Sequence, residues 1–493
     1  MIRAMVLTGL ASIACHAMAC EPGFELCTGL RNEIDVTSLD SPGVRTRAPF
    51  GDMLGVHSLF WETQSVLAND SGELKTEALS LLKKSGVRLI RQGGGANEID
   101  WQQCAGAVAS RKPQKVASWM PPVPCRFGIK EYEKAVDALG LTRSWHVANL
   151  VGVEFQVAPV ERMAQVAGQR ATHTREMAGK GREIHWELGN EVERGRYPWS
   201  TAEIIARMTS VGEAIRKADP AVKLVAPVLE YRPANIANEY EYNGAVIRAM
   251  KPLVQDFALH TYYENPPEGP SLHNRLTYIR RLTDQIRKQV PQGMLWVTEH
   301  ARWPKGSPSD GNRWRNNWYQ TTDVDGVLAT ADFLVGMSQI DGVAGAMWHG
   351  LRAGPWNFLD VDADARISAG QMAKLFEFLS AQLGDRLPVP AATTVGVMSR
   401  AGGQGELRAS AFVSPGRKDQ LAVVVVNRGR DAMRFDLRIK GVAPSVTRQG
   451  VASFSPAVGQ ASIQQKSTSG GDAGLHELVA SARSVTVFQL QLK

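Results

Sequence analysis

Several sequence features are missing from this 493-residue chain, and their absence excludes some classes of protein. Beyond the N-terminus, no apolar run approaches the roughly 18 residues that cross a bilayer, so no transmembrane segment is expected. The 56 Lys and Arg residues face 49 Asp and Glu, a net charge of +7, without any basic run or aromatic-basic module. Nucleic acid is therefore not an expected partner. The remaining composition, 44% hydrophobic and 21% charged, is that of a globular protein with a core.

Motifs for metals and phosphates are missing too. The chain has 5 cysteines, and their spacings do not repeat as CxxC, so a zinc site is not expected. Gly93-Gly94-Gly95 is not followed by Gly-Lys-Ser/Thr, which excludes a phosphate loop; such a run lets the backbone pass close to a ligand or a neighbouring strand. The sequence thus predicts neither a bound metal nor a cofactor.

The first 19 residues have the pattern of a signal peptide. Met1-Ile2-Arg3 gives a positive start, residues 4–14 are apolar, and Ala17-Met18-Ala19 is a small-x-small cleavage site. We therefore expect a secreted or periplasmic protein. Cleavage would place Cys20 first, as in lipoproteins, but Ala17 stands where those usually carry Leu, so lipid anchoring is the less favoured reading.

Export agrees with the number of cysteines left after cleavage, which is even. Neighbours in sequence suggest the disulfides Cys20–Cys27 and Cys104–Cys125, although four cysteines allow three pairings. The second would staple an irregular, proline-rich stretch.

Residues 49–386 alternate short apolar runs with amphipathic segments. We expect strands at 53–60, 87–91, 151–157, 183–189, 222–228, 256–263, 294–298 and 343–348. Helices are expected at 72–85, 130–139, 161–179, 201–218 (with Ser200 as its cap), 238–250, 272–289, 323–340 and 368–383. Eight strand–helix units predict an α/β fold, a (β/α)8 or TIM barrel.

Residues 387–493 differ in character. Runs typical of strands, at 407–413, 421–426, 433–439, 446–454 and 485–492, predict a C-terminal β-sandwich, with 460–474 as a long surface loop. The N-terminal segment 20–48 is expected to precede the barrel and can add strands to this sandwich.

Two glutamates stand at the ends of predicted barrel strands. Glu191 follows Asn190 at the end of the fourth, and Glu299 ends the seventh. Active sites of such barrels lie at the carboxyl ends of the strands. Paired carboxylates there suit glycoside hydrolysis, with Glu299 as nucleophile and Glu191 as acid and base. Because each charge raises the other's proton affinity, we expect Glu191 to stay protonated until Glu299 is neutralised as an ester.

Several further pieces make the chain resemble retaining glycoside hydrolases of clan A. It is most similar to the α-L-arabinofuranosidase family, glycoside hydrolase family 51, with families 39 and 79 as neighbours. The similar pieces are Trp186 to Glu191, Arg91 with its glycines, His260 to Tyr263 with Pro266 to Glu268, residues 327–337, and Gly384 to Leu387. They span about residues 45–390, and that family also carries a trailing β-sandwich.

The resemblance implies a carbohydrate substrate and a set of residues that contact it: Asn190, Arg91, Asn97, His260, Tyr262, Trp348 and His349. Arg91 and Tyr262 would hold Glu299 ionised, and Asn190 would bind the sugar hydroxyl next to the anomeric carbon. The chain departs from the family after Glu299 (His300-Ala301-Arg302), at Gly93 to Asn97, and at Met347 to His349. Those positions contact the sugar, so the identity of the sugar stays open.

Other readings stay open. Glu191 could be a solvated loop acid, and Glu299 could pair with His300 or Arg302. Glu187 suits a buried ion pair with a barrel arginine such as Arg88. His260 could be a hydrogen-bonded core residue. His349 could be a packed rim residue.

The segment after the seventh and eighth strands is rich in tryptophan and basic residues. Tryptophans stack on sugar rings, and arginine binds carboxylates. The pairing keeps open a β-glucuronidase- or xylosidase-like enzyme that acts on an acidic glycan, and a non-catalytic carbohydrate-binding protein is the alternative of another class. The tryptophans and basic residues of this segment are Trp303, Trp314, Trp318, Trp348, Trp356, Arg302, Lys305, Arg313, Arg315 and Arg352.

The sequence leaves the oligomeric state of the protein open.

Overall fold

The computed structural model describes residues 31–35, 39, 47–94, 99–116, 121–153, 156–194, 197–230, 238–264, 271–389, 394–395, 407–440, 446–464, 468–469 and 475–492. By their contacts these residues form two compact units. One holds residues 47–327 and 340–385; the other holds β1, residues 328–339 and the described residues from 386 on.

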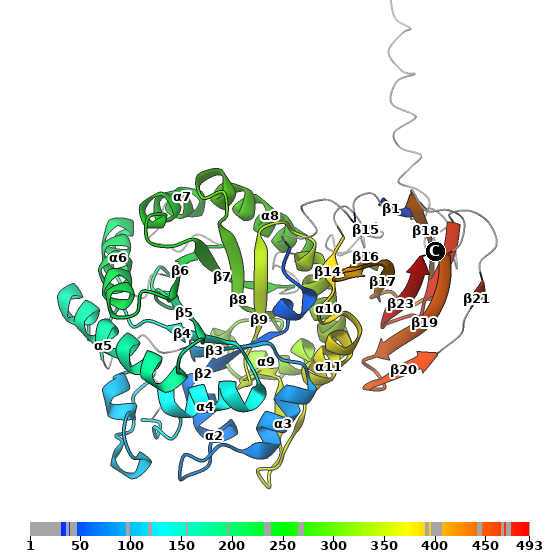
Figure 1. Cartoon of the computed structure of the whole chain (residues 1–493). Helices are drawn as coiled ribbons and strands as arrows, with labels where there is room; N and C mark the ends of the chain where they lie inside the picture. The colour runs from blue at the N-terminus through cyan, green and yellow to red at the C-terminus, as the bar shows by residue number, and fades with distance from the viewer. Residues whose placement is uncertain are drawn as a thin grey trace, which may run out of the picture. The chain divides into compact units, whose positions relative to one another are not determined.

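Eight parallel strands close into a barrel in the first unit (Figure 1). Pairing of β2 with β9 closes the ring, which confirms the predicted TIM barrel. Large side chains fill its interior, among them Trp145, Trp296 and Met347. The strands are β2 (Gly55–Leu59), β3 (Leu89–Gly94), β4 (Arg143–Val147), β5 (Glu183–Glu187), β6 (Lys223–Val228), β7 (Asp256–Tyr263), β8 (Met294–Arg302) and β9 (Val343–His349).

Helices surround these strands (Figure 1). The predicted cap of α6 is confirmed, because the Ser200 side chain accepts a hydrogen bond from the backbone N–H of Glu203. The helices are α2 (Phe60–Val66), α3 (Thr76–Lys84), α4 (Ile129–Leu139), α5 (Val160–Ala178), α6 (Thr201–Ala218), α7 (Glu239–Met250), α8 (Leu272–Gln289), α9 (Asn312–Arg315), α10 (Val324–Ser338) and α11 (Gln371–Leu383). Single 3-10 turns lie at Phe50–Met53, Trp101–Cys104, Val108–Ser110, Pro308–Asp310 and Trp318–Thr321.

The third strand is not where the sequence predicted it. The strand is β4, Arg143–Val147, and residues 151–153 and 156–157 lie in the loop that follows it. The loop starts with a turn in which the Asn149 side chain accepts from the N–H groups of Val151 and Gly152. β4 itself is half polar, but the carboxylate of Glu133 on α4 binds both its Ser144 and His146. Because the polar side chains of β4 bind a residue of α4, the strand can be buried without the apolar pattern on which the prediction relied.

The second unit is a β-sandwich of two sheets. The smaller has the order β1-β18-β22, and the larger β14-β16-β17-β23-β19-β20, with β15 on β16 and β21 on β19. Apolar residues of both sheets form one core, including Ile34 of β1 in the smaller sheet and Val423 of β17 in the larger. The strands are β1 (Arg31–Asp35), β14 (Leu387–Pro388), β15 (Thr394–Val395), β16 (Leu407–Ser414), β17 (Arg417–Asn427), β18 (Met433–Lys440), β19 (Val446–Ser455), β20 (Gln460–Gln464), β21 (Thr468–Ser469), β22 (Leu475–Ala480) and β23 (Ser484–Leu492).

One sandwich prediction was wrong, because the expected loop at 460–474 contains β20 and β21, which both pair with β19. Three further strands were not predicted. They are β22, which pairs with β18, and the two-residue strands β14 and β15, which pair with β16.

Short hairpins follow β9 in the first unit. They are formed by β10 (Arg352–Ala353) with β11 (Trp356–Asn357), and by β12 (Leu359–Val361) with β13 (Ile367–Ala369). The disulfide Cys104–Cys125 is confirmed. Cys20 and Cys27 lie outside the described residues, as does the predicted signal peptide. Among the described residues, none of the helices has the length and apolarity that crossing a bilayer requires.

Candidate active site

A buried ion pair between β3 and β5 forms the floor of the barrel mouth. Arg91 and Glu187 are both fully buried, and two hydrogen bonds of 2.7 and 2.9 Å join them. Trp145 Nε1 and Thr298 Oγ1 donate to the same carboxylate. Burial opposes the charge of Glu187, but the charge of Arg91 and the bonds from His260 and Arg91 outweigh it and lower its pKa to about 2.

The structure corrects the partner suggested for Glu187. Arg88 instead binds Asp385, at 2.8 Å. Arg91 thus has a role beyond contacting Glu299: it orients the residues around it. Its Nη2 donates to Asn190 Oδ1 at 2.9 Å, and its Nη1 lies 2.8 Å from His57 Nδ1.

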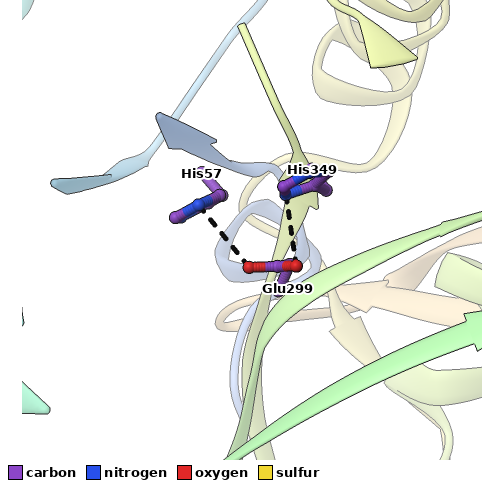
Figure 2. Close-up of side chains that lie close together, drawn as sticks. All are labelled: His57, Glu299 and His349. Carbon is purple, nitrogen blue, oxygen red and sulfur yellow. Dashed lines mark ion pairs between the residues drawn. The ribbon is translucent and has the colours of Figure 1, made fainter. Parts of the chain in front are cut away.

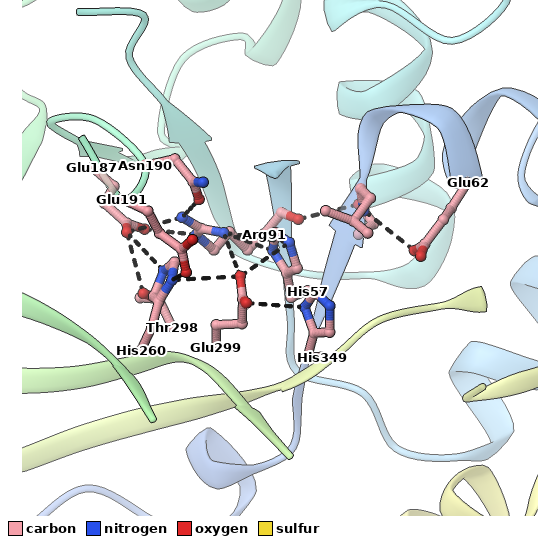
Figure 3. A network of polar contacts seen from close by, with 12 residues as sticks. His57, Glu62, Arg91, Glu187, Asn190, Glu191, His260, Thr298, Glu299 and His349 are labelled. Atoms are coloured by element: carbon pink, nitrogen blue, oxygen red, sulfur yellow. Dashed lines mark hydrogen bonds and ion pairs between the residues drawn. The ribbon is translucent and has the colours of Figure 1, made fainter. Parts of the chain in front are cut away.

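Glu299, on β8, is surrounded by hydrogen-bond donors and basic side chains from other strands (Figures 2 and 3). Tyr262 donates its hydroxyl to Oε1. His57 and His260 each place a ring nitrogen 3.5 Å from Oε2, His349 lies 3.4 Å from Oε1, and Arg91 lies 3.7 Å from Oε2. Burial raises the pKa of Glu299, but His349 and His260 outweigh it and hold that pKa well below its usual range.

An irregularity in β8 explains why Glu299 reaches this place. The pairing of β8 shifts register on both sides, between Ala258 and His260 of β7 and between Val297 and His300 facing β9. Strand side chains ordinarily alternate between faces, yet Thr298 and the next residue, Glu299, both face the barrel interior, where they contact Glu187 and Tyr262. An extra residue in a strand re-aims side chains in this way.

Glu191 follows the end of β5 in a tight turn. Its φ is +54°, a left-handed conformation that is uncommon for a residue with a side chain and that costs free energy. One of its oxygens lies 2.8 Å from His260 Nδ1 and 2.9 Å from Arg194 Nη1. Ligand atoms of Glu191, His260 and Glu299 lie within 4.8 Å of one another, so the two carboxylates are neighbours.

The charge state of Glu191 differs from the expectation. Burial and Glu299 raise its pKa, but Arg194 and His260 outweigh them, so the pKa is lowered rather than raised. The pKa of His260 is about 9, because the charge of Glu299 and the bonds to Glu187 and Glu191 outweigh burial. In the free protein the proton expected on Glu191 therefore rests on His260, 2.8 Å away.

The fold of the chain is similar to that of known structures. One is a family 51 α-L-arabinofuranosidase from Bifidobacterium longum, with a TM-score of 0.70 and 13% identity over 94% of this chain and 100% of that one. Another, from Thermotoga petrophila, has a TM-score of 0.68 and 17% identity over 93% and 99%. A third is a family 44 xyloglucanase from Paenibacillus polymyxa, with a TM-score of 0.57 and 12% identity over 94% of this chain and 99% of that one. Sequence comparisons with family models and with curated proteins gave no match.

The chain has the fold of the family 51 α-L-arabinofuranosidases. The likeness in fold covers both the barrel and the β-sandwich, as the sequence predicted. At these identities it concerns the fold alone, so the chemistry of the site depends on the residues described above.

His57, in the middle of β2, is a residue of the site that sequence reasoning missed. It is fully buried and stacks on His349, with ring centroids 5.1 Å apart. Burial and the charge of Arg91 hold its pKa well below the usual range, so the ring is neutral. Because Arg91 can only donate, Nδ1 of His57 accepts and Nε2 carries the hydrogen, which points at Glu299. A histidine within the first strand was the available signal.

His57, Glu299 and His349 also have the composition of a metal site, with ligand atoms within 4.8 Å. The hydrogen that Arg91 fixes on Nε2 of His57 leaves no lone pair there for an ion. Ligating histidines instead donate their other N–H to an acceptor. We therefore assign no metal to these residues.

The other predicted contacts divide into those at the site and those away from it. Tyr262, His349 and Asn190 lie at the mouth. Trp348 was expected to contact substrate, but it is fully buried and packs on Phe358, outside the ring of inward-facing residues. Asn97 lies outside the described residues. Arg302 does not pair with Glu299; it holds the following loop through Glu264, Asp323 and the carbonyl of Gln320.

Proposed function

We propose that this protein is a retaining glycoside hydrolase that cleaves a polysaccharide or oligosaccharide, most similar in action to an α-L-arabinofuranosidase. The observation that carries the proposal is the neighbouring pair Glu191 and Glu299 at the carboxyl ends of barrel strands. A carboxylate oxygen of one lies within 4.8 Å of a carboxylate oxygen of the other. Retaining enzymes place their carboxyl groups about 5 Å apart, whereas inverting enzymes need about 6.5–9.5 Å to admit a water.

Glu299 is the nucleophile, since its pKa is the one held far below the usual range. It attacks the anomeric carbon as the glycosidic C–O bond breaks, which leaves an ester of the sugar with Glu299. Glu191 passes a proton to the departing oxygen. A water then gives a proton to Glu191, its oxygen replaces Glu299 at the anomeric carbon, and the double displacement retains the configuration.

His260 supplies the proton that Glu191 lacks in the free protein. Apart from burial, the charge of Glu299 is the main influence on the pKa of His260, and it raises that pKa. Formation of the ester removes this charge, which favours transfer of the proton from Nδ1 of His260 to Glu191 Oε1 and on to the leaving oxygen. The hydrogen bond of Asn190 with Arg91 keeps its amide beside the same carboxylates, where we expect it to bind the neighbouring sugar hydroxyl.

The proposal extends to the organisation and location of the chain. Residues 1–19 are a signal peptide, 20–48 an N-terminal segment, 49–386 the catalytic barrel and 387–493 the sandwich. Secretion or periplasmic export suits the disulfide Cys104–Cys125, since disulfides persist in oxidising compartments.

A panel of aryl glycosides of arabinofuranose, xylose, glucuronic acid and glucose tests the activity. We expect turnover of at least one, with arabinofuranoside first, and a first-formed sugar of retained configuration by proton NMR. Loss of turnover in the Glu299→Gln variant is the control. Binding of sugars without hydrolysis of any member would instead indicate a carbohydrate-binding protein, and an inverted product would contradict double displacement.

A further inference from the structure

An aromatic wall leads from Glu299 out of the barrel mouth. Trp303 and Trp356 each contact the ring of Tyr262, with centroids 5.0 and 5.3 Å apart, and Trp356 also contacts His349. Trp303 contacts Trp314 at 6.0 Å, and Trp314 contacts Trp318 at 5.3 Å. The wall, defined as Trp303, Trp314, Trp318 and Trp356, is thus continuous with the candidate active site.

Hydrogen bonds and packing hold the wall in place. Trp303 Nε1 donates to the carbonyl of Gly306, and Trp356 Nε1 donates to the carbonyl of Arg302. Trp318 packs beside Gly354 in the turn between β10 and β11. Trp303, Trp314 and Trp318 nevertheless remain partly exposed. Large aromatic faces left in solvent beside a catalytic mouth suit stacking on sugar rings.

Three cations accompany the wall. Lys305 follows Trp303 by two residues, and Arg313 and Arg315 flank Trp314 on α9. All three side chains are exposed, and none has an ion pair among the residues that the structure describes. The one acid between Trp303 and Thr322, Asp310, accepts from the backbone N–H of Ser307. With three cations against one acid, the segment from Trp303 to Thr322 carries a net positive charge.

We propose that the wall is an extended substrate subsite for a glycan chain that bears carboxylate or sulfate groups. Its tryptophans stack on successive sugar rings, and Lys305, Arg313 and Arg315 bind the anionic groups. This inference rests on the proposed function for the place of the wall in catalysis. It goes further in naming a charged chain, longer than one sugar, as the substrate.

The test measures binding rather than turnover, by calorimetry with the Glu299→Gln protein at low ionic strength. Its probes are pairs of oligosaccharides with and without charge: glucuronoxylan fragments against xylo-oligosaccharides, oligogalacturonates against their methyl esters, and sulfated against desulfated galactan fragments. At least one acidic member should bind about tenfold more tightly than its neutral partner, and added salt should remove the preference. The pair that responds shows whether carboxylate or sulfate is bound.

Substitutions separate the charges from the rings. Arg313→Gln with Arg315→Gln should weaken the acidic member about three- to tenfold, as expected of two exposed ion pairs, and leave the neutral member unchanged. Arg280→Gln with Arg281→Gln, two exposed arginines of α8, is the matched control and should change neither. Trp314→Ala should weaken both members equally. Circular dichroism checks that each variant is folded.

Equal binding of the charged and neutral members in every pair, or no binding of either, would overturn the inference. The inference would also be overturned if Arg280→Gln with Arg281→Gln weakened binding of the acidic member as much as Arg313→Gln with Arg315→Gln. Hydrolysis of small neutral aryl glycosides does not involve the wall. Turnover without a charge preference therefore refutes only the wall, and a charge preference without turnover refutes only the proposed function.

Discussion

At the scale of single residues, the charge of Glu299 depends on groups from four strands. Tyr262 is the one that donates directly to its oxygen, from β7. Burial, with the charges of Glu299 and Glu191, raises the pKa of the tyrosine well above its usual range, so the hydroxyl keeps its proton and remains a donor. A carboxylate that accepts a hydrogen bond is stabilised in its charged form.

Tyr262→Phe should therefore raise the pKa of Glu299. Because a lowered pKa keeps the nucleophile charged at acidic pH, the acidic limb of the kcat/KM profile should move to higher pH. The value of kcat/KM on an aryl glycoside should fall about tenfold to a hundredfold. Tyr319→Phe, at a tyrosine that is 62% exposed, is the control. An unchanged acidic limb in Tyr262→Phe would show that the phenol does not set this charge.

The roles of the two glutamates can be separated by leaving group and by azide. Glu299→Ala should abolish turnover of every substrate, because no ester can form, and azide or formate should restore it with an inverted product. Glu191→Ala should still form the ester from dinitrophenyl glycosides, which need no protonation. The ester should then accumulate, and azide should speed turnover with a retained product. Identical behaviour of the two variants would refute the assignment, and exchanged behaviour would reverse the roles.

At the scale of elements, one buried ion pair joins β3 to β5. The pKa of Glu187 is about 2 in the folded protein, against about 4.3 when unfolded, a difference of about 3 kcal/mol. Because the folded pKa is the lower one, this stabilisation is present above about pH 4.3 and is lost as the pH falls toward about 2. Arg91 needs the same charge, since it is fully buried itself.

Glu187→Gln should destabilise the barrel at pH 7 by about 3–5 kcal/mol, because it leaves Arg91 buried without its main partner. The loss should shrink as the pH falls from about 4.3 toward about 2, because the unfolded wild-type chain takes up a proton on Glu187 in this range and the folded protein takes it up last. Urea unfolding followed by circular dichroism across this range is the measurement. Glu213→Gln, at an exposed glutamate of α6, is the control and should change the free energy of unfolding little at any pH. A constant difference between wild type and Glu187→Gln at every pH would contradict the expectation.

Helices and strands could be predicted from the sequence where the pattern of apolar residues is local. The helix predicted at 272–289 and the strand predicted at 256–263 match α8 and β7, since each carries its own apolar period. β4 and β22 were missed. The polar side of β4 is bound by Glu133 of α4, a contact that no local window contains. Around the candidate site, the positions of Glu191 and Glu299 followed from counting strands, whereas the contact of Arg91 with His57 depends on the register of β3 against β2, which a count of strands does not give.

At the scale of the whole molecule, α10 begins in one compact unit and continues in the other. Residues up to Val327 belong with the barrel, and residues from Leu328 belong with the sandwich. On the latter part Asp332 is 3% exposed, and it binds Arg408 and Arg428. Removing one partner of a buried ion pair leaves an uncompensated charge, which is the costly case.

Arg408→Met should therefore destabilise the protein by about 3–5 kcal/mol, because Asp332 stays buried with a single partner. Arg417→Met is the matched control: its ion pair with Asp419 is at the surface, with side chains 58% and 42% exposed, and its removal should change the stability little. Since one helix runs through both units, we expect the glycosidase activity and the circular dichroism signal of Arg408→Met to be lost at the same, lowered temperature. Activity that survives above the transition of the sandwich would show that the barrel does not depend on it.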